Sequence, residues 1–177
     1  KAEECNILYE KYKNKKGEIM SGVILRKTKN TYYISIDNSK IDVVLGPREQ
    51  IRNEKYNIGD KITFYIVDVK KDLNNTAKII ASRTHPEFVR KLLEREITEV
   101  FDKTIEIVNI ARDPGSRCKI SVLSHDMNVD PVGTCVGNRG GKIQAIVREL
   151  NNEKIDVIPY DSSPEIYIKN SLKPAQV

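Results

Sequence analysis

The stretch Val136-Gly137-Asn138-Arg139-Gly140-Gly141-Lys142 decides how the C-terminal half of the chain folds. Before it, Asp130-Pro131 has the pattern of a helix start, with Asp as the cap and Pro in the first turn. After it, apolar residues recur at the spacing of one helix face, namely Ile143, Ile146, Val147 and Leu150. We therefore predict two helices joined by a Gly-x-x-Gly turn that carries a cation at Arg139.

Such a turn suits an anionic ligand. The second helix presents unbonded backbone N–H groups at its start, and its dipole favours negative charge there. Glycines without a Cβ allow a sugar–phosphate backbone to come close, and Arg139 and Lys142 add positive charge. A Gly-x-x-Gly loop that clamps about four nucleotides between two helices is the arrangement of KH domains. The alternative interpretation is a glycine-rich helix–helix turn that binds nothing.

The RNA-contacting residues expected at this turn are Val136, Gly137, Asn138, Arg139, Gly140, Gly141, Lys142 and Ile143. We expect the phosphates to follow the glycines and the bases to lie in a groove. Val136, Ile143 and the edge of a strand at 155–157 would form the walls of that groove.

The other elements of residues 85–177 support the same fold. Apolar spacing predicts one long helix from Pro86 through Lys103. Strands are predicted at 104–111, 119–123 and 154–158, with a hairpin turn at 113–116 and a last helix starting near Ser163. The order helix, strand, strand, helix, Gly loop, helix, strand is that of the prokaryotic-type (type II) KH domain.

Residues 17–84 have the period of β-strands. Apolar residues alternate in five short segments, at 17–25, 32–36, 41–45, 62–67 and 77–82, and turn residues separate the segments. The economical fold is a small closed barrel, and five strands in this length predict an OB-fold, which commonly binds single-stranded nucleic acid. The chain as a whole is thus predicted to be α+β with two domains, 17–84 and 85–177.

Three side chains of the barrel are candidates for RNA contact. Tyr33 lies on the strand face opposite Ile34 and Ile36, where it could stack on a base; the alternative is an ordinary cross-strand aromatic. Arg48 and Arg83, at the edges of the barrel, are candidates for contact with the RNA backbone. A single surface arginine is otherwise a solvated charge.

Residues 1–16 are rich in Lys and place Cys5, Leu8, Tyr9 and Tyr12 at helical spacing. No other part of the sequence is an obvious partner for that face. We expect either the end of a helix that belongs to an upstream element or a frayed basic tail.

The charge distribution indicates where a polyanion would be attracted. The net charge is +5. Residues 1–85 carry 17 Lys and Arg against 11 Asp and Glu, whereas residues 86–177 carry 13 against 14. The general attraction for RNA therefore lies in the N-terminal half. The C-terminal half depends on the local cluster of Arg139, Lys142 and Arg148.

The composition also bounds the class of protein. No apolar run approaches the roughly 18 residues of a membrane helix, so no membrane contact is expected. The three cysteines form no Cys-x-x-Cys pair and there are two histidines, so neither a structural metal site nor a disulfide framework is expected. A reducing, cytoplasmic setting fits this composition.

The sequence contains no constellation for catalysis. The P-loop pattern fails because Gly141-Lys142 is followed by Ile143. The nucleophile elbow, the zinc-protease pattern and the dinucleotide fingerprint are absent as well. We expect a binding protein without cofactor.

Several segments resemble, in order, the NusA family of bacterial transcription elongation, termination and antitermination factors. They are residues 82–96, 111–119, 128–133 and 147–150, and the likeness spans about residues 17–177. The resemblance implies a barrel of the ribosomal protein S1 type followed by the first of two KH domains. It implies RNA contacts at Gly137, Asn138, Arg139, Gly140 and Lys142. In this family an RNA polymerase-binding domain precedes the barrel, and residues 1–16 correspond to its final helix.

The resulting hypothesis is a non-catalytic fragment that binds single-stranded, nascent RNA and modulates pausing of RNA polymerase, with other transcription factors as possible partners. One alternative is the RNA-binding accessory region of an exoribonuclease. Polynucleotide phosphorylase carries both domain types in the opposite order, which argues against it. The other alternative is a KH fold that serves only as a protein-interaction platform.

Overall fold

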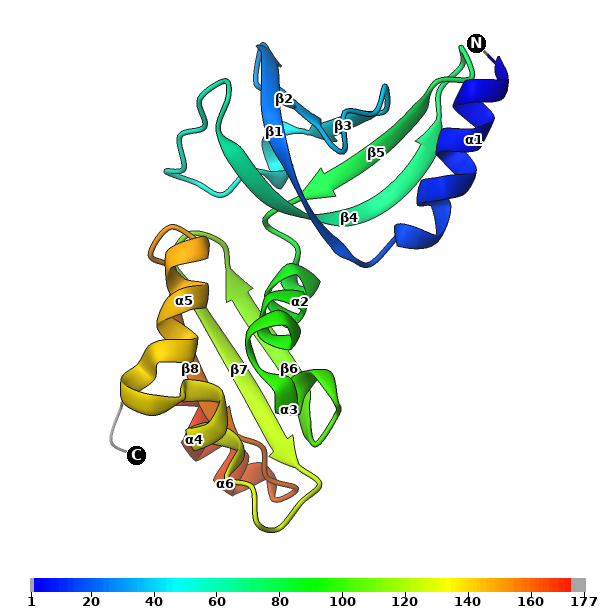
Figure 1. The fold of residues 1–177 in the computed structure, drawn as a ribbon. Helices are drawn as coiled ribbons and strands as arrows, with labels where there is room; N and C mark the ends of the chain where they lie inside the picture. Colours follow the sequence, from blue (N-terminus) through cyan, green and yellow to red (C-terminus); the bar gives the residue numbers. More distant parts are fainter. Residues whose placement is uncertain (1, 173–177) are drawn as a thin grey trace. The chain divides into compact units, whose positions relative to one another are not determined.

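The computed structural model describes residues 2–172, and the chain divides into two compact units, Lys1–Lys91 and Leu92–Val177 (Figure 1). The division falls within helix α2 (Pro86–Glu96). Each unit has its own sheet and its own buried core. Among the described residues, no helix is long and apolar enough to cross a membrane.

The first unit is built on a closed five-stranded barrel with the strand order β1-β2-β3-β5-β4 (Figure 1). The strands are β1 (Ile19–Thr28), β2 (Thr31–Ser35), β3 (Asp42–Leu45), β4 (Lys61–Lys71) and β5 (Ala77–Ser82). All neighbouring strands are antiparallel except β3 and β5, which are parallel. The predicted five-stranded OB-fold barrel is confirmed.

Alternation along the strands sorts side chains between the core and the outside. Ile34 in β2 and Ile36 directly after the strand are 1% exposed. Tyr33 and Ser35 alternate with them along the chain and are half-buried on the outer face of β2. A β-bulge follows Ile24 in β1, where the register with β2 shifts. Burial of each large apolar side chain stabilises the fold by about 1.5–3 kcal/mol. A shift of β2 by one residue would expose these side chains, so the core determines which face of β2 points outward.

Helix α1 (Ala2–Tyr12) packs against the barrel. Tyr12 is 1% exposed, and its hydroxyl donates to the carboxylate of Asp37 at 3.4 Å. Cys5, Leu8 and Tyr9 pack against the same core. A 3-10 turn, η1 (Lys13–Lys15), then leads into β1. The apolar face for which the sequence offered no partner is thus covered by the barrel itself.

The second unit has a three-stranded sheet with the order β6-β7-β8 (Figure 1). Its strands are β6 (Ile105–Asp113), β7 (Arg117–Ser124) and β8 (Lys154–Pro159), and its helices are α3 (Thr98–Phe101), α4 (Pro131–Val136), α5 (Gly141–Glu149) and α6 (Pro164–Ser171). The hairpin β6–β7 is antiparallel and β7–β8 is parallel. This mixed sheet, with the element order expected from the sequence, confirms the KH fold.

The two faces of β7 have different neighbours. Cys118, Ile120 and Val122 are at most 1% exposed and belong to the core. Lys119 and Ser121 alternate with them and therefore lie on the opposite face, where they bond to α6. The Tyr167 hydroxyl donates to Ser121 Oγ at 2.9 Å. Helix α6 consequently covers the face of the sheet opposite Ile120.

The single long helix predicted from Pro86 to Lys103 is wrong. The chain forms α2 and then the short α3, and Ile97 between them has an extended backbone with φ −124° and ψ 109°. Ile97 is fully buried, as is Leu93 at 1% exposure. The helical spacing of apolar residues continues across Ile97 because residues on both sides of the break are buried in the core, so the sequence pattern gives no sign of the break.

Candidate nucleic-acid interface

The Gly-x-x-Gly turn joins α4 to α5, as expected. Gly137 ends α4 with φ 77° and ψ −179°, and a 3-10 turn, η3 (Asn138–Gly140), follows. Within it, Arg139 and Gly140 both have left-handed backbones, with φ 54° and 73°. Helix α5 starts at Gly141, whose φ and ψ are ordinary helical values of −61° and −39°.

The glycines of this turn differ in their surroundings. A Cβ on Gly137 would lie 2.7 Å from Cγ of Lys142, so this glycine accommodates a neighbouring side chain. A Cβ on Gly140 or Gly141 would meet no atom within 4 Å apart from its chain neighbours and the backbone of the helix itself. The open side of the turn therefore lies at residues 140 and 141, where a ligand backbone can approach without a steric obstacle.

The start of α5 is suited to an anion. Its N-cap residue is Gly140, which has no side chain that could accept a hydrogen bond from the first turn of the helix. The helix spans nine residues, and its dipole adds partial positive charge at this end. Asn138 and Arg139 are exposed directly before it. Backbone N–H groups, the dipole and a cation thus meet at one place, as phosphate binding requires.

The two cations of the turn have different environments. Arg139 is exposed, and within residues 2–172 no ion pair involves it. Lys142 Nζ lies 3.9 Å from Oε2 of Glu99 in α3, and the two side chains are 40% and 35% exposed. Glu99 was not identified from the sequence, because its 43-residue separation from Lys142 leaves no local pattern. Arg148, the third cation of the cluster, is exposed and donates to the Gln144 carbonyl.

The expected groove walls are largely apolar. Val136 is half-buried at the end of α4, and Ile143 in α5 is 7% exposed, so Ile143 contributes mainly to the core. Strand β8 is an edge strand of the sheet, and its residues 155–157 are half-buried. The surface between the turn and this edge can therefore accept planar, partly apolar groups such as bases.

Tyr33 lies on the outer face of the barrel, under a cation. The guanidinium of Arg26 is 4.2 Å from its ring centroid, and the two residues are paired across β1 and β2. Ser35 lies two residues after Tyr33 on the same face of β2, and it borders an open hollow of about 420 Å³. The exposed side chains of Val23 and Leu25 also line this hollow. A charged, aromatic and apolar surface of this kind suits unstacked bases.

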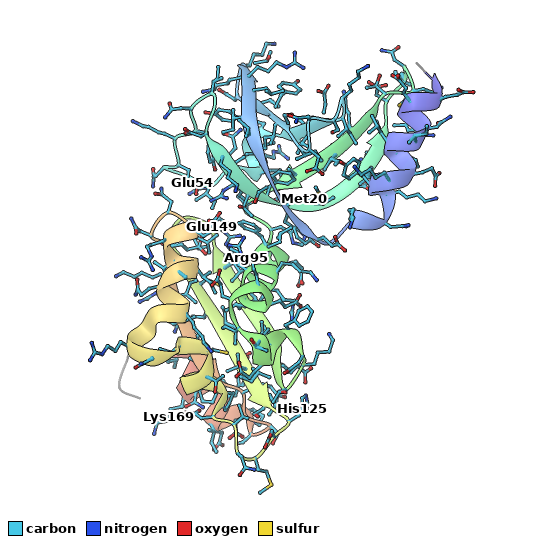
Figure 2. The ribbon with its side chains drawn as sticks, viewed as in Figure 1. Met20, Glu54, Arg95, His125, Glu149 and Lys169 are labelled. Atoms are coloured by element: carbon cyan, nitrogen blue, oxygen red, sulfur yellow. The ribbon has the colours of Figure 1, made fainter. Side chains whose placement is uncertain are left out.

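The two arginines expected to contact the RNA backbone are placed very differently. Arg48 is exposed in a 3-10 turn, η2 (Pro47–Glu49). Arg83 is 4% exposed and makes a bidentate ion pair with Glu54 at 2.7 and 2.9 Å. Glu54 is labelled in Figure 2. Arg83 also donates to the carbonyl of Thr63 at 2.5 Å. Arg83 therefore holds the barrel together, and contact with RNA does not fit its surroundings.

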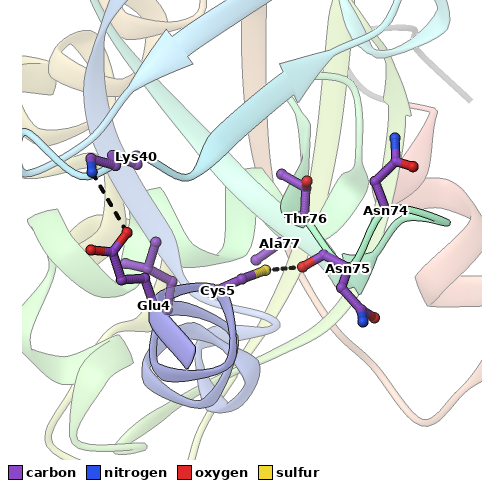
Figure 3. Close-up of a pocket in the computed structure, with 8 residues that line it drawn as sticks. Glu4, Cys5, Lys40, Asn74, Asn75, Thr76 and Ala77 are labelled. Atoms are coloured by element: carbon purple, nitrogen blue, oxygen red, sulfur yellow. Dashed lines mark hydrogen bonds and ion pairs between the residues drawn. The ribbon is translucent and has the colours of Figure 1, made fainter. Parts of the chain in front are cut away.

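A second hollow, of about 390 Å³, lies between α1 and the turn before β5 (Figure 3). In it the Cys5 thiol donates to the Asn75 carbonyl, and Glu4 pairs with Lys40 at 3.6 Å. These contacts connect α1 to two separate turns of the barrel. The polar groups that line this hollow therefore serve the packing of α1 on the barrel.

The buried thiols are not activated. Burial raises the pKa of Cys118 to about 12, with Glu153 as the next contribution, and raises that of Cys135 to about 11. Both are therefore neutral thiols at neutral pH rather than nucleophiles. Among the described residues, no group of three or more His, Cys, Asp and Glu side chains could hold a metal ion.

Comparison with known proteins finds two family models in the chain. The model described as the S1 RNA binding domain matches residues 13–78, and the model described as the NusA-like first KH domain matches residues 83–160.

Similar proteins carry the name transcription termination/antitermination protein NusA. The one from Bacillus subtilis is 40% identical over 174 residues, covering 98% of this chain and 46% of that protein. The one from Thermus thermophilus is 38% identical over 177 residues, covering 100% of this chain and 45% of that protein. The one from Helicobacter pylori J99 is 39% identical over 170 residues, covering 96% of this chain and 42% of that protein. The chain thus spans somewhat less than half the length of these relatives.

Proposed function

The chain is homologous to the S1 and first KH domains of the NusA transcription termination/antitermination proteins, and we propose that it binds single-stranded RNA through both domains. In this proposal the RNA is the nascent transcript, and its retention by the chain modulates pausing and termination by RNA polymerase in the cytoplasm. The role is one of binding without catalysis. Contact with the polymerase is assigned to parts of NusA proteins outside the matched segment.

In the KH domain, the phosphates follow the turn from Asn138 to Gly141. The observation that carries this assignment is the empty space in front of Gly140 and Gly141, at the uncapped start of α5. Arg139 supplies an exposed positive charge beside that space. The bases then lie toward Val136 and the edge of β8, since KH surfaces read splayed, single-stranded bases.

In the S1 barrel, the RNA lies across the outer face of β1 and β2. Tyr33 stacks on a base, with Arg26 above the ring and the hollow at Val23 and Leu25 beside it. Arg48 is available to a phosphate near the same sheet. The excess positive charge of residues 1–85 supports a general attraction of the barrel for RNA.

The decisive experiment places negative charge on the phosphate path without changing its shape. The variant Asn138→Asp with Gly140→Asp is compared with Gly140→Asn, which has the same size as Gly140→Asp but no charge. Asp and Asn both tolerate the left-handed backbone at residue 140, and the side chain meets no neighbour there. Affinity is measured by fluorescence anisotropy with a labelled single-stranded RNA of 15 to 20 nucleotides, with circular dichroism as the folding check.

We expect the double Asp variant to lose roughly tenfold or more in affinity at 0.1 M salt, while Gly140→Asn stays close to the wild type. A folded double Asp variant with wild-type affinity would contradict the assignment of the loop. The slope of log affinity against log salt should be clearly negative for the wild type. A chain that binds no RNA at any salt concentration would instead favour the protein-interaction alternative.

A further inference from the structure

The positions of Glu99 and Lys142 lead to an inference that rests on the proposed RNA-binding function and adds to it. We propose that Glu99 is a positioning residue that holds Lys142 away from the RNA phosphates. In the second unit, Arg139 is then the one cation of the Gly loop that contacts the nucleic acid. The sequence predicted phosphate contacts from both Arg139 and Lys142, whereas this arrangement leaves the contact of Arg139 alone.

The first observation is the orphaned carboxylate oxygen of Glu99. Its Oε2 is buried and has no hydrogen-bond partner among the described residues. The ammonium of Lys142 lies 3.9 Å from it. A buried carboxylate oxygen without a hydrogen bond is costly, so Glu99 gains from keeping a cation beside it.

The second observation is the path of the Lys142 side chain. Its Cβ, Cγ and Cδ would all lie within 3.1 Å of a Cβ on Gly137. The aliphatic part of the lysine therefore runs across the first glycine of the turn, in the space that a side chain would otherwise fill. An exposed ion pair alone would hold a lysine weakly, but this packing fixes the stem as well as the charge.

The third observation is the buried thiol of Cys135, two residues before Gly137. Burial raises its pKa most, Lys142 then lowers the pKa, and Glu99 raises it. Both charged groups therefore lie close to the same buried sulfur, on the side of the turn that faces the interior. A Cβ on Gly140 would meet neither of these two side chains within 4 Å.

The consequence is a loop whose net charge is lower than the sequence suggests. The carboxylate of Glu99 neutralises one of the two cations, and the phosphate path retains the charge of Arg139 and the N–H groups of α5. Such an arrangement lowers general, salt-dependent attraction while leaving the backbone clamp in place. It makes binding depend more on the fit of the bases than on charge.

The test is a double-mutant cycle on the whole chain with the same labelled RNA. The variants are Glu99→Gln, Lys142→Met and the two together, measured between 0.05 and 0.4 M salt. Glu96→Gln removes the same charge three positions earlier, from a carboxylate that lies 3.5 Å from Arg95, and serves as the matched control. Both the affinity and its slope against salt are recorded.

We expect Glu99→Gln to release the lysine toward the phosphates. One additional phosphate contact makes the slope of log affinity against log salt more negative by about 0.7. It also tightens RNA binding about fivefold at 0.1 M salt. Lys142→Met alone should change affinity less than twofold, and the double variant should return to the wild-type slope. Glu96→Gln should leave both quantities unchanged.

Two results would overturn the inference. Either Lys142→Met flattens the slope in the wild-type background, so that the lysine already contacts phosphate, or Glu99→Gln changes neither affinity nor slope. Failure of the proposed function looks different, because then the charges at residues 138 and 140 also have no effect. If the charges at residues 138 and 140 weaken RNA binding but Glu99→Gln changes neither affinity nor salt slope, only the inference about Glu99 is contradicted.

Discussion

Arg112 and Glu153 form an ion pair in which both side chains are completely buried. The Arg112 Nε donates to Glu153 Oε2 at 3.0 Å, and the backbone N–H of Gly115 donates to Oε1 at 2.7 Å. One carboxylate thus connects the tip of the β6–β7 hairpin to the residue that precedes β8. Its position fixes where the edge strand beside the Gly loop begins.

Glu153→Gln should destabilise the KH domain severely. The amide keeps the size of the carboxylate but removes the countercharge of a buried guanidinium, which typically costs about 3–5 kcal/mol. The exposed pair of Glu106 with His125 provides the control, and Glu106→Gln should cost no more than about 1 kcal/mol. Urea unfolding followed through NMR resonances of residues in β6 to β8 measures both. Equal unfolding midpoints for the two variants would contradict the prediction.

Substitutions of the loop glycines should separate backbone strain from helix formation. Gly137→Ala forces a Cβ onto a residue with φ 77° and ψ −179° and against Lys142, so we expect a loss of about 1–3 kcal/mol. Gly141→Ala has helical φ and ψ and free space, so it should be neutral or stabilising by up to about 1 kcal/mol. Thermal unfolding gives the order of stabilities. A Gly137→Ala variant as stable as Gly141→Ala would show that the turn adopts another backbone.

The two arginines of the barrel should give opposite results. Arg83→Met leaves Glu54 buried without its ion-pair partner and should destabilise the barrel by about 3–5 kcal/mol. Arg48→Ala changes an exposed residue, so the stability should stay within about 0.5 kcal/mol while RNA affinity falls. Chemical unfolding and RNA titration are both needed for each variant. A stable Arg83→Met variant with weakened RNA binding would reverse this distinction.

Local patterns in the sequence were sufficient for the architecture and insufficient for the contacts. Strand alternation and the Gly-x-x-Gly turn predicted both folds, because each depends on neighbours within a few residues. The ion pairs of Arg83 with Glu54 and of Lys142 with Glu99 join residues 29 and 43 positions apart. Nothing in the periodicity of the chain indicates such pairs. The same limit applies to the break at Ile97, where tertiary packing overrides a continuous helical spacing.

The buried thiols should make stability fall at alkaline pH. In the folded chain the pKa values of Cys118 and Cys135 are about 12 and 11, against an ordinary value of 9.0. Above pH 9 the unfolded chain loses these protons while the folded chain keeps them, so the folded state loses stability as pH rises toward 11. Each thiol contributes a slope of at most about 1.4 kcal/mol per pH unit. Below pH 9 the contribution is fully present.

The comparison with Cys118→Ala/Cys135→Ala isolates this effect. The two proteins share every other titratable group, so the difference between the two slopes reports the thiols. We expect the variant to be less stable at pH 8, because it leaves cavities, but to lose less stability between pH 9 and 11. Parallel curves would mean that the thiols are accessible to water in the folded state.

Tyr33 should contribute to RNA affinity through its ring alone. Its ring lies on the outer face of the barrel with Arg26 above it, so Tyr33→Ala removes a stacking surface without opening the core. The expected loss is about 1–3 kcal/mol of binding free energy, with little change in the salt slope, because no cation is lost. Tyr33→Phe keeps the ring and should bind like the wild type. If Tyr33→Ala binds RNA as tightly as Tyr33→Phe, the tyrosine is a cross-strand packing residue, and the RNA path over the barrel must lie elsewhere.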